Sequence, residues 1–72
     1  MQIIDFKAQA DQAIKGIIAR NLLDDAIFAR KNDDFGGLAY IIAMGLKLDH
    51  KQPIKFGLIF EVVDTLDALE VV

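Results

Sequence analysis

The stretch that decides the fold is residues 32–47, NDDFGGLAYIIAMGLK. Asp33 and Asp34 precede a glycine pair, and no charged residue follows until Lys47. Aspartate directly before an apolar run is a favoured helix N-cap, so either acid fits that position. Intervals of three and four residues place the following side chains on one helix face: Leu38, Ile41, Ile42, Gly45 and Leu48. The stretch therefore predicts an Asp-capped helix with a broad apolar surface.

Two other interpretations of this stretch fail on its composition. A phosphate-binding loop uses glycines to converge backbone N–H groups on an anion, usually with a lysine in the turn. Gly36 and Gly37 instead follow two acids, which would repel phosphate, and no lysine stands beside them. A membrane-spanning helix needs roughly 20 apolar residues, and the uncharged run from Phe35 to Leu46 is shorter.

Helical periodicity continues on the N-terminal side of this stretch. The spacing predicts one helix over about Asp5–Arg20, with Asp5 as its N-cap, and a second over about Leu22–Lys31. Asn21 is the expected cap of the second helix, because it begins a sequence that resembles a capping box. A single continuous helix is the alternative, and a break near Asn21 is favoured over it.

On the C-terminal side, a polar connection at 49–52 leads to a fourth expected helix. Pro53 should stand at or near its first helical position, which suits proline. The segment KFGLIFEVV, residues 55–63, also fits a strand because it is rich in β-branched and aromatic residues. Helix is favoured over strand because a 3-4-3 spacing connects Phe56, Ile59, Val63 and Leu66.

These segments predict an all-α fold, a small three- or four-helix bundle that forms a single domain over residues 1–72. A chain of this size buries only about 60% of its unfolded surface. It has no cysteine for a disulfide, yet 54% of its residues are hydrophobic. Gly16, Gly45 and Gly57 fall within expected helices, where close approach of another helix is one reason to tolerate glycine. We therefore expect the bundle to be completed by oligomerisation or by a partner.

The charge distribution disfavours nucleic-acid binding. Net charge is −3, and residues 32–72 carry seven acidic against three basic groups. Nucleic-acid binding needs the opposite balance, because it depends on neutralising phosphates. A helix-turn-helix is also disfavoured, because its groove-entering helix would be GGLAYIIAMGLK, which has no arginine, asparagine or glutamine for base edges. The acids from Glu61 to Glu70 fit a basic protein partner instead, or serve only solubility.

Composition also argues against an enzyme. The chain has no serine, no cysteine and one threonine, which excludes a serine or cysteine nucleophile. The single histidine, His50, is expected in a solvated turn. The pairs Asp24–Asp25 and Asp33–Asp34 lack the spacing of a calcium loop, and helix capping accounts for them. We expect no catalytic, metal-binding or cofactor-binding residue.

The C-terminal half resembles an acyl or peptidyl carrier protein. DDFGGLAYIIAMGLKL, residues 33–48, is similar to that family's D-S-L motif and second helix, and LIFEVVDTLDALEVV, residues 58–72, is similar to its ending. Thr65–Leu66 stands where the family has Thr-Val before its last helix. The resemblance implies a degenerate carrier, because Gly37 occupies the place of the phosphopantetheine-bearing serine.

The sequence thus favours a non-enzymatic, acidic helical module for protein–protein interaction, which associates with itself or docks on a partner. One alternative is a regulatory inhibitor or decoy of the phage or mobile-element type, acting through an acidic C-terminal helix face. Others are the degenerate carrier-like fold and a small enzyme or ligand-binding domain with an apolar pocket. Residues 1–12 lack the basic start and sustained apolar core of a secretory signal, so a cytoplasmic location is expected. The candidate contact residues are Leu38, Ile41, Ile42, Phe56, Ile59, Phe60, Val63, Leu66, Glu61, Asp64 and Asp67.

Overall fold

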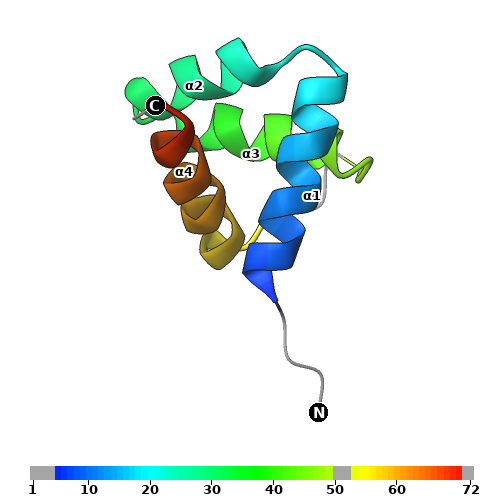
Figure 1. Cartoon of the computed structure of the whole chain (residues 1–72). Helices are drawn as coiled ribbons and strands as arrows, with labels where there is room; N and C mark the ends of the chain where they lie inside the picture. Colours follow the sequence, from blue (N-terminus) through cyan, green and yellow to red (C-terminus); the bar gives the residue numbers. More distant parts are fainter. Residues whose placement is uncertain (1–4, 50–52, 71–72) are drawn as a thin grey trace.

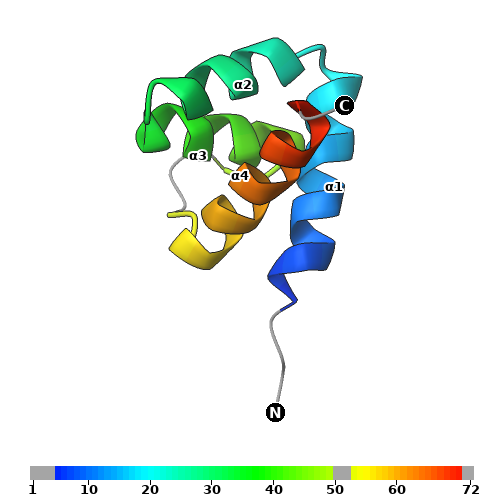
Figure 2. The same ribbon diagram turned by 60° about the vertical axis from the view of Figure 1, so that its left-hand side comes forward.

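The computed structural model describes residues 5–49 and 53–70, and every regular element in them is an α-helix. The four helices are α1 (Phe6–Ala19), α2 (Leu23–Lys31), α3 (Phe35–Gly45) and α4 (Phe56–Glu70). α1 packs mainly against α3 and α4, and α2 lies across one end of the bundle against α3 (Figure 1). The turned view shows α4 rising from the level of the N-terminal end of α1 toward α2 (Figure 2). The all-α prediction is confirmed.

Aspartates cap α1 and α3, as the sequence predicts. The Asp5 carboxylate accepts a hydrogen bond from the Ala8 N–H at 3.1 Å. Asp34 Oδ1 accepts one from the Gly37 N–H at 2.9 Å, so Asp34 rather than Asp33 is the cap of α3. Each bond satisfies an N–H group that has no carbonyl partner in the first helical turn.

The favoured break between the first two helices is confirmed, but the capping box at Asn21 is wrong. α2 begins at Leu23 and has no side-chain hydrogen bond at its N-cap, Leu22. Asn21 instead has a φ of 60°, in the left-handed region. Asparagine is one of the few residues that tolerate this region, so Asn21 ends α1 and turns the chain toward α2.

The first three helices end in the same way, with a left-handed residue that is not glycine. These residues are Asn21, Asp33 and Lys47, with φ values of 60°, 54° and 59°. In each case the next amide donates to the carbonyl five residues earlier: Leu22 to Ile17, Asp34 to Ala29 and Leu48 to Ala43, each at 2.9 Å. This is the hydrogen-bond pattern of the Schellman motif, in which glycine is the usual left-handed residue.

Lys47→Gly is therefore expected to raise the free energy of unfolding by about 0.5–1 kcal/mol. Glycine has no Cβ, so it adopts the left-handed conformation without the steric cost that lysine has there. Part of that gain is lost because glycine has greater conformational freedom in the unfolded chain. Urea denaturation measures the difference. Lys47→Ala is the control, because alanine keeps the penalty and should change stability little. A glycine variant no more stable than the alanine variant would contradict this account.

Proline's preference for the first turn predicted Pro53 at or near the start of α4, but Pro53 does not begin the helix. The helix starts three residues later, at Phe56, after Ile54 and Lys55. The amides of Leu58 and Ile59 both donate to the Lys55 carbonyl, so the first hydrogen bonds of the helix are accepted by Lys55. The strand alternative for residues 55–63 is wrong, because α4 covers all of them but the first.

The core is entirely apolar among the described residues, with no buried polar or charged residue. Its largest fully buried side chains come from α1, α3 and α4: Ile17, Leu38, Ile42, Val62 and Leu66. α2 contributes the smaller Ala26 and Ala29. The apolar face of α3 is thus covered within this one chain.

Gly16 and Gly45 allow α1 and α3 to cross at backbone contact. A Cβ added to Gly16 would overlap the carbonyl oxygen of Gly45, and one added to Gly45 would lie 2.6 Å from the carbonyl oxygen of Ala13. Gly57 plays a similar part between α1 and α4, where the ring of Phe6 occupies the space that a Cβ would need. The close approach expected from glycines inside helices is confirmed at these crossings.

Candidate functional site

Three phenylalanines form a cluster of rings on the outside of the molecule, named here the aromatic surface. Phe35, Phe56 and Phe60 are 39%, 70% and 55% exposed. The rings of Phe35 and Phe60 meet edge to face with centroids 6.5 Å apart, and those of Phe56 and Phe60 stack at 6.3 Å. Such geometries are favourable for aromatic pairs, so the rings hold one another in place while remaining open to solvent.

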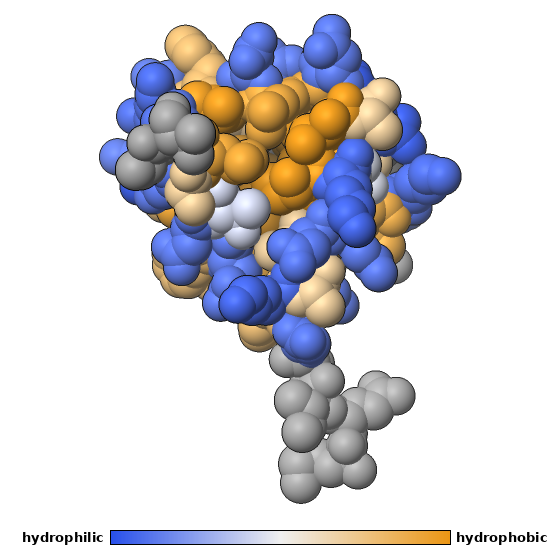
Figure 3. Space-filling model, viewed as in Figure 1, coloured by the Kyte–Doolittle hydropathy of each residue, from blue (hydrophilic) through white to orange (hydrophobic). Residues whose placement is uncertain are grey.

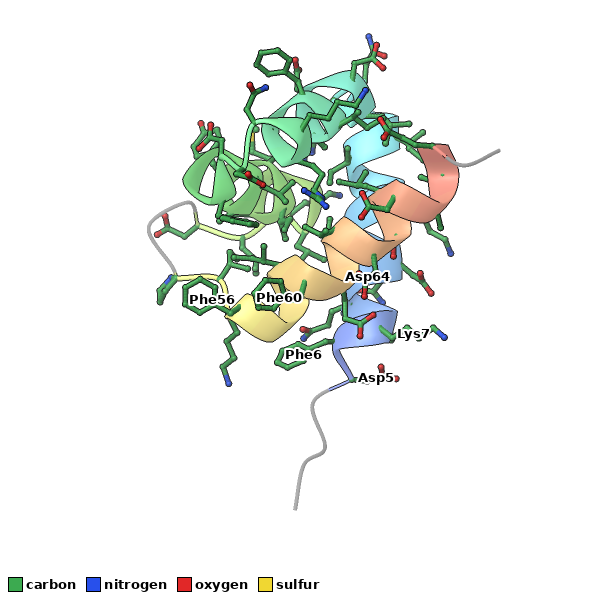
Figure 4. The ribbon with its side chains drawn as sticks, turned by 90° about the vertical axis from the view of Figure 1, so that its left-hand side faces the viewer. Asp5, Phe6, Lys7, Phe56, Phe60 and Asp64 are labelled. Atoms are coloured by element: carbon green, nitrogen blue, oxygen red, sulfur yellow. The ribbon has the colours of Figure 1, made fainter. Side chains whose placement is uncertain are left out.

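Two helices position the aromatic surface. Phe56 and Phe60 lie one turn apart on α4, and Figure 4 shows them in succession along that helix, with Asp64 beyond them. Phe35 is the first residue of α3, directly after the Asp34 cap. Ile59 and Val63 are buried on the other side of α4 and fix its rotation against the core. The surface is therefore presented by packed helices rather than by a loop.

The acids near the end of α4 are largely matched by cations of α2. Arg30 Nη2 lies 3.3 Å from Asp67 Oδ2, and Lys31 Nζ lies 3.4 Å from Glu70 Oε1. Arg30 also approaches Asp33 at 3.5 Å, and its Nε is buried without a hydrogen-bond partner. These ion pairs offset acids at a helix C-terminus, where the dipole disfavours anions.

A second apolar area faces the viewer in Figure 3, where α1, α2 and α4 come together. The larger aliphatic residues of these helices that are not fully buried are Ile18, Leu22, Leu23, Ile27 and Leu69. Leu22, Leu23 and Ile27 pack against the core and are only half-exposed. Ile18 and Leu69 are 53% and 46% exposed, so this area combines the edge of the core with two exposed aliphatic side chains, whereas the aromatic surface consists of rings in contact with one another.

One pocket of about 230 Å³ opens beside the start of α4. Its walls are mostly apolar and come from α1, the end of the α3 region and the start of α4: Phe6, Gln9, Leu48, Pro53, Ile54, Lys55 and Leu58. Small-molecule sites usually enclose about 300–1,000 Å³ and contain several convergent polar groups. This pocket is smaller and offers only Gln9 and Lys55 as polar side chains.

The other sequence candidates have structural roles where they are described. The Gly37 N–H is bound by the Asp34 carboxylate, and that carboxylate fills the space beside Gly37. Asp24 and Asp25 occupy the first turn of α2, where the helix dipole favours acids, although neither caps the helix, whose N-cap is Leu22. Among residues 5–49 and 53–70, no group of three potential metal ligands comes together. His50 lies outside the described residues.

The predicted contact residues separate into buried, half-buried and exposed residues. Six of them are buried in the core of the chain itself: Leu38, Ile41, Ile42, Ile59, Val63 and Leu66. Glu61 and Asp67 are half-buried, while Phe56, Phe60 and Asp64 are exposed. Phe35 was not among the predicted residues, although it completes the aromatic surface. Its position directly after a cap was visible in the sequence, but its contact with Phe60 depends on how α3 and α4 pack.

Comparison with known proteins adds no family to this description. No protein-family model matches the chain, and neither a curated protein nor a solved structure matches it. The resemblance to carrier proteins gains no support from these comparisons. In the part of the chain that is described, no helix is long and apolar enough to cross a membrane.

Proposed function

We propose that this chain is a non-enzymatic protein–protein interaction module whose contact surface is the aromatic surface. The observation that carries the proposal is the clustering of Phe35, Phe56 and Phe60, in which Phe60 contacts both other rings and all three remain 39–70% exposed. Phenylalanine is enriched at protein interfaces, where burying a whole side chain contributes about 1.5–3 kcal/mol. Exposed on the free chain, the rings contribute little of that stabilisation.

The aromatic surface is favoured over the acidic face of α4 as the contact site. Asp67 and Glu70 already pair with Arg30 and Lys31, so a basic partner would have to displace those contacts. Glu61 is half-buried, which leaves Asp64 as the exposed acid in the middle of the helix. These features weaken the inhibitor or decoy alternative, because its proposed charges are partly satisfied within the chain.

A photo-reactive phenylalanine analogue tests the proposal by its position. The analogue placed at Phe56 or Phe60 is expected to cross-link a protein partner several-fold more than the analogue at Phe28. Phe28 is the matched control, because it is 70% exposed, as Phe56 is, and lies on α2 outside the aromatic surface. Equal cross-linking at all three positions in cells that make the protein would contradict the proposal.

A further inference from the structure

We infer that α2 is a lid on the core, which opens by local unfolding while α1, α3 and α4 stay packed, and that two ion pairs with α4 help to hold it shut. The inference does not involve the aromatic surface, so it goes beyond the proposed function. It depends on how little of the core α2 provides, on how its ends are built and on what joins it to α4.

α2 contributes less to the core than each of the other helices. Among residues 5–49 and 53–70, its buried side chains are Ala26 and Ala29, whereas α1, α3 and α4 each bury isoleucine or leucine side chains. Its larger inward residues, Leu23 and Ile27, are only half-buried. Hydrophobic stabilisation follows the apolar area removed from water, so detaching α2 costs less than detaching any other helix.

α2 lies at one end of the molecule, where it can leave without separating the other three helices (Figures 1 and 2). It packs chiefly on α3, whereas α1 makes its main contacts with α3 and α4. Opening would therefore uncover apolar surface of α3 and leave the backbone crossing at Gly16 and Gly45 in place. The opened state is a minor population of the folded protein, so denaturation of the chain stays a single transition.

The turns on both sides of α2 contain a left-handed residue, Asn21 before the helix and Asp33 after it. Its N-cap, Leu22, makes no side-chain hydrogen bond, unlike the caps of α1 and α3. Unwinding releases both left-handed residues, whose conformation has a steric cost when the residue is not glycine. Only residues 20–22 and 32–34 connect α2 to its neighbours, so it must unwind rather than swing out as a rigid helix.

Two ion pairs, named here the latch, join the last turn of α2 to the last turn of α4. Arg30 Nη2 lies 3.3 Å from Asp67 Oδ2, and Lys31 Nζ lies 3.4 Å from Glu70 Oε1. These side chains are 33–65% exposed, so each pair contributes little and is weakened by salt. Arg30 Nε, buried without a hydrogen-bond partner among the described residues, would reach water in the opened state. The latch therefore adds a modest, salt-sensitive stabilisation of the closed lid.

Hydrogen exchange of the full chain, followed amide by amide with NMR, tests the inference. After correction for intrinsic rates, the central amides of α2 are expected to exchange at least about tenfold faster than those of α1, α3 and α4. They should agree with one another within about threefold, because one opening exposes all of them. Protection in α2 equal to that in α3 would show that α2 is released only by global unfolding, which overturns the lid.

Neutral variants of the two acids test the latch. Asp67→Asn and Glu70→Gln together should speed exchange in α2 about fivefold and leave α1 and α3 unchanged within about twofold. Both acids lie at the C-terminus of α4, where the dipole disfavours anions, so their removal does not weaken α4 by itself. Asp64→Asn is the matched control, because Asp64 is an exposed acid of α4 outside the latch. An effect of the control as large as that of the latch variant would overturn the latch.

The contribution of one pair is isolated by a double-variant cycle. Glu70→Gln should speed exchange in α2 about twofold in the original chain and have no effect when Lys31→Gln is already present. Raising the salt concentration from about 0.05 M to 1 M should speed exchange in α2 relative to α3 in the original chain, and much less in the chain that lacks both acids. Equal salt responses in the two chains would also overturn the latch.

An independent measurement uses the absence of cysteine from the sequence. Ala26 of α2 and Ala10 of α1 are both 0% exposed, so a single cysteine at either position reacts with a thiol reagent only after opening. Ala26→Cys is expected to be labelled at least about tenfold faster than Ala10→Cys, with both variants shown to be folded by circular dichroism. Equal labelling rates would overturn the lid, whatever the aromatic surface is found to bind.

Discussion

Gly16→Ala is expected to lower the free energy of unfolding by about 3 kcal/mol, the largest destabilisation expected from adding one methyl group to this chain. The added Cβ would overlap the Gly45 carbonyl oxygen, which belongs to backbone and cannot turn away as a side chain can. The helices α1 and α3 must therefore separate, and the contacts of Ile17 and Ile42 in the core loosen with them. A domain of this length has a total free energy of unfolding of about 4–11 kcal/mol, so the substitution would remove much of its stability.

Gly36→Ala is the matched control for this prediction. Gly36 is also helical, but a Cβ there would meet only Asp34 Oδ1, at 3.9 Å. The control should gain about 0.5 kcal/mol, because alanine is the better helix former. Urea denaturation of both variants measures the difference. If Gly16→Ala unfolds with the midpoint of the original chain, the backbone crossing between α1 and α3 is not as close as described.

Leu66→Ala is expected to cost about 3 kcal/mol of unfolding free energy, within the 2–5 kcal/mol typical of a leucine truncated in a core. Leu66 is 1% exposed and packs among the core side chains contributed by α1, α3 and α4. Removing its isobutyl group both loses burial and leaves a cavity that surrounding helices can close only in part. Thermal or urea denaturation checks the value.

Leu69→Ala provides the comparison on the same helix. Leu69 is 46% exposed, so the same substitution should cost less than about 1 kcal/mol. Similar costs at the two positions would mean that α4 is rotated away from the arrangement described. The pair therefore tests which face of α4 the chain uses for its own core.

The helices and two of their caps could be predicted from the sequence because the signals are local. Apolar intervals of three and four residues located all four helices, and the aspartates before α1 and α3 indicated their first turns. Helix ends were less predictable. Asn21 has the chemistry of both an N-cap and a left-handed terminator, and only the position of Leu22 relative to Ile17 decides between them.

The candidate surface could be predicted only in part, for a geometric reason. The spacing of Ile59, Val63 and Leu66 places them on one apolar helix face. It does not show whether that face packs against the chain's own core or against another molecule. Phe60 lies off the buried face of α4, which made its exposure predictable. The contact between Phe35 and Phe60 joins residues from different helices, and no interval in the sequence encodes it.

The pattern of helix contacts has a consequence for how the chain acquires its structure. α1 packs chiefly on α3 and α4, whereas α1 and α2, although consecutive, touch only slightly, as do α3 and α4. Neither half of the chain therefore contains a complete core, and α1 gains about half of its packing only after the residues of α4 have been made. Folding should be a single cooperative event of the whole chain, slower than in helix bundles built from neighbouring hairpins, because its decisive contacts close long loops.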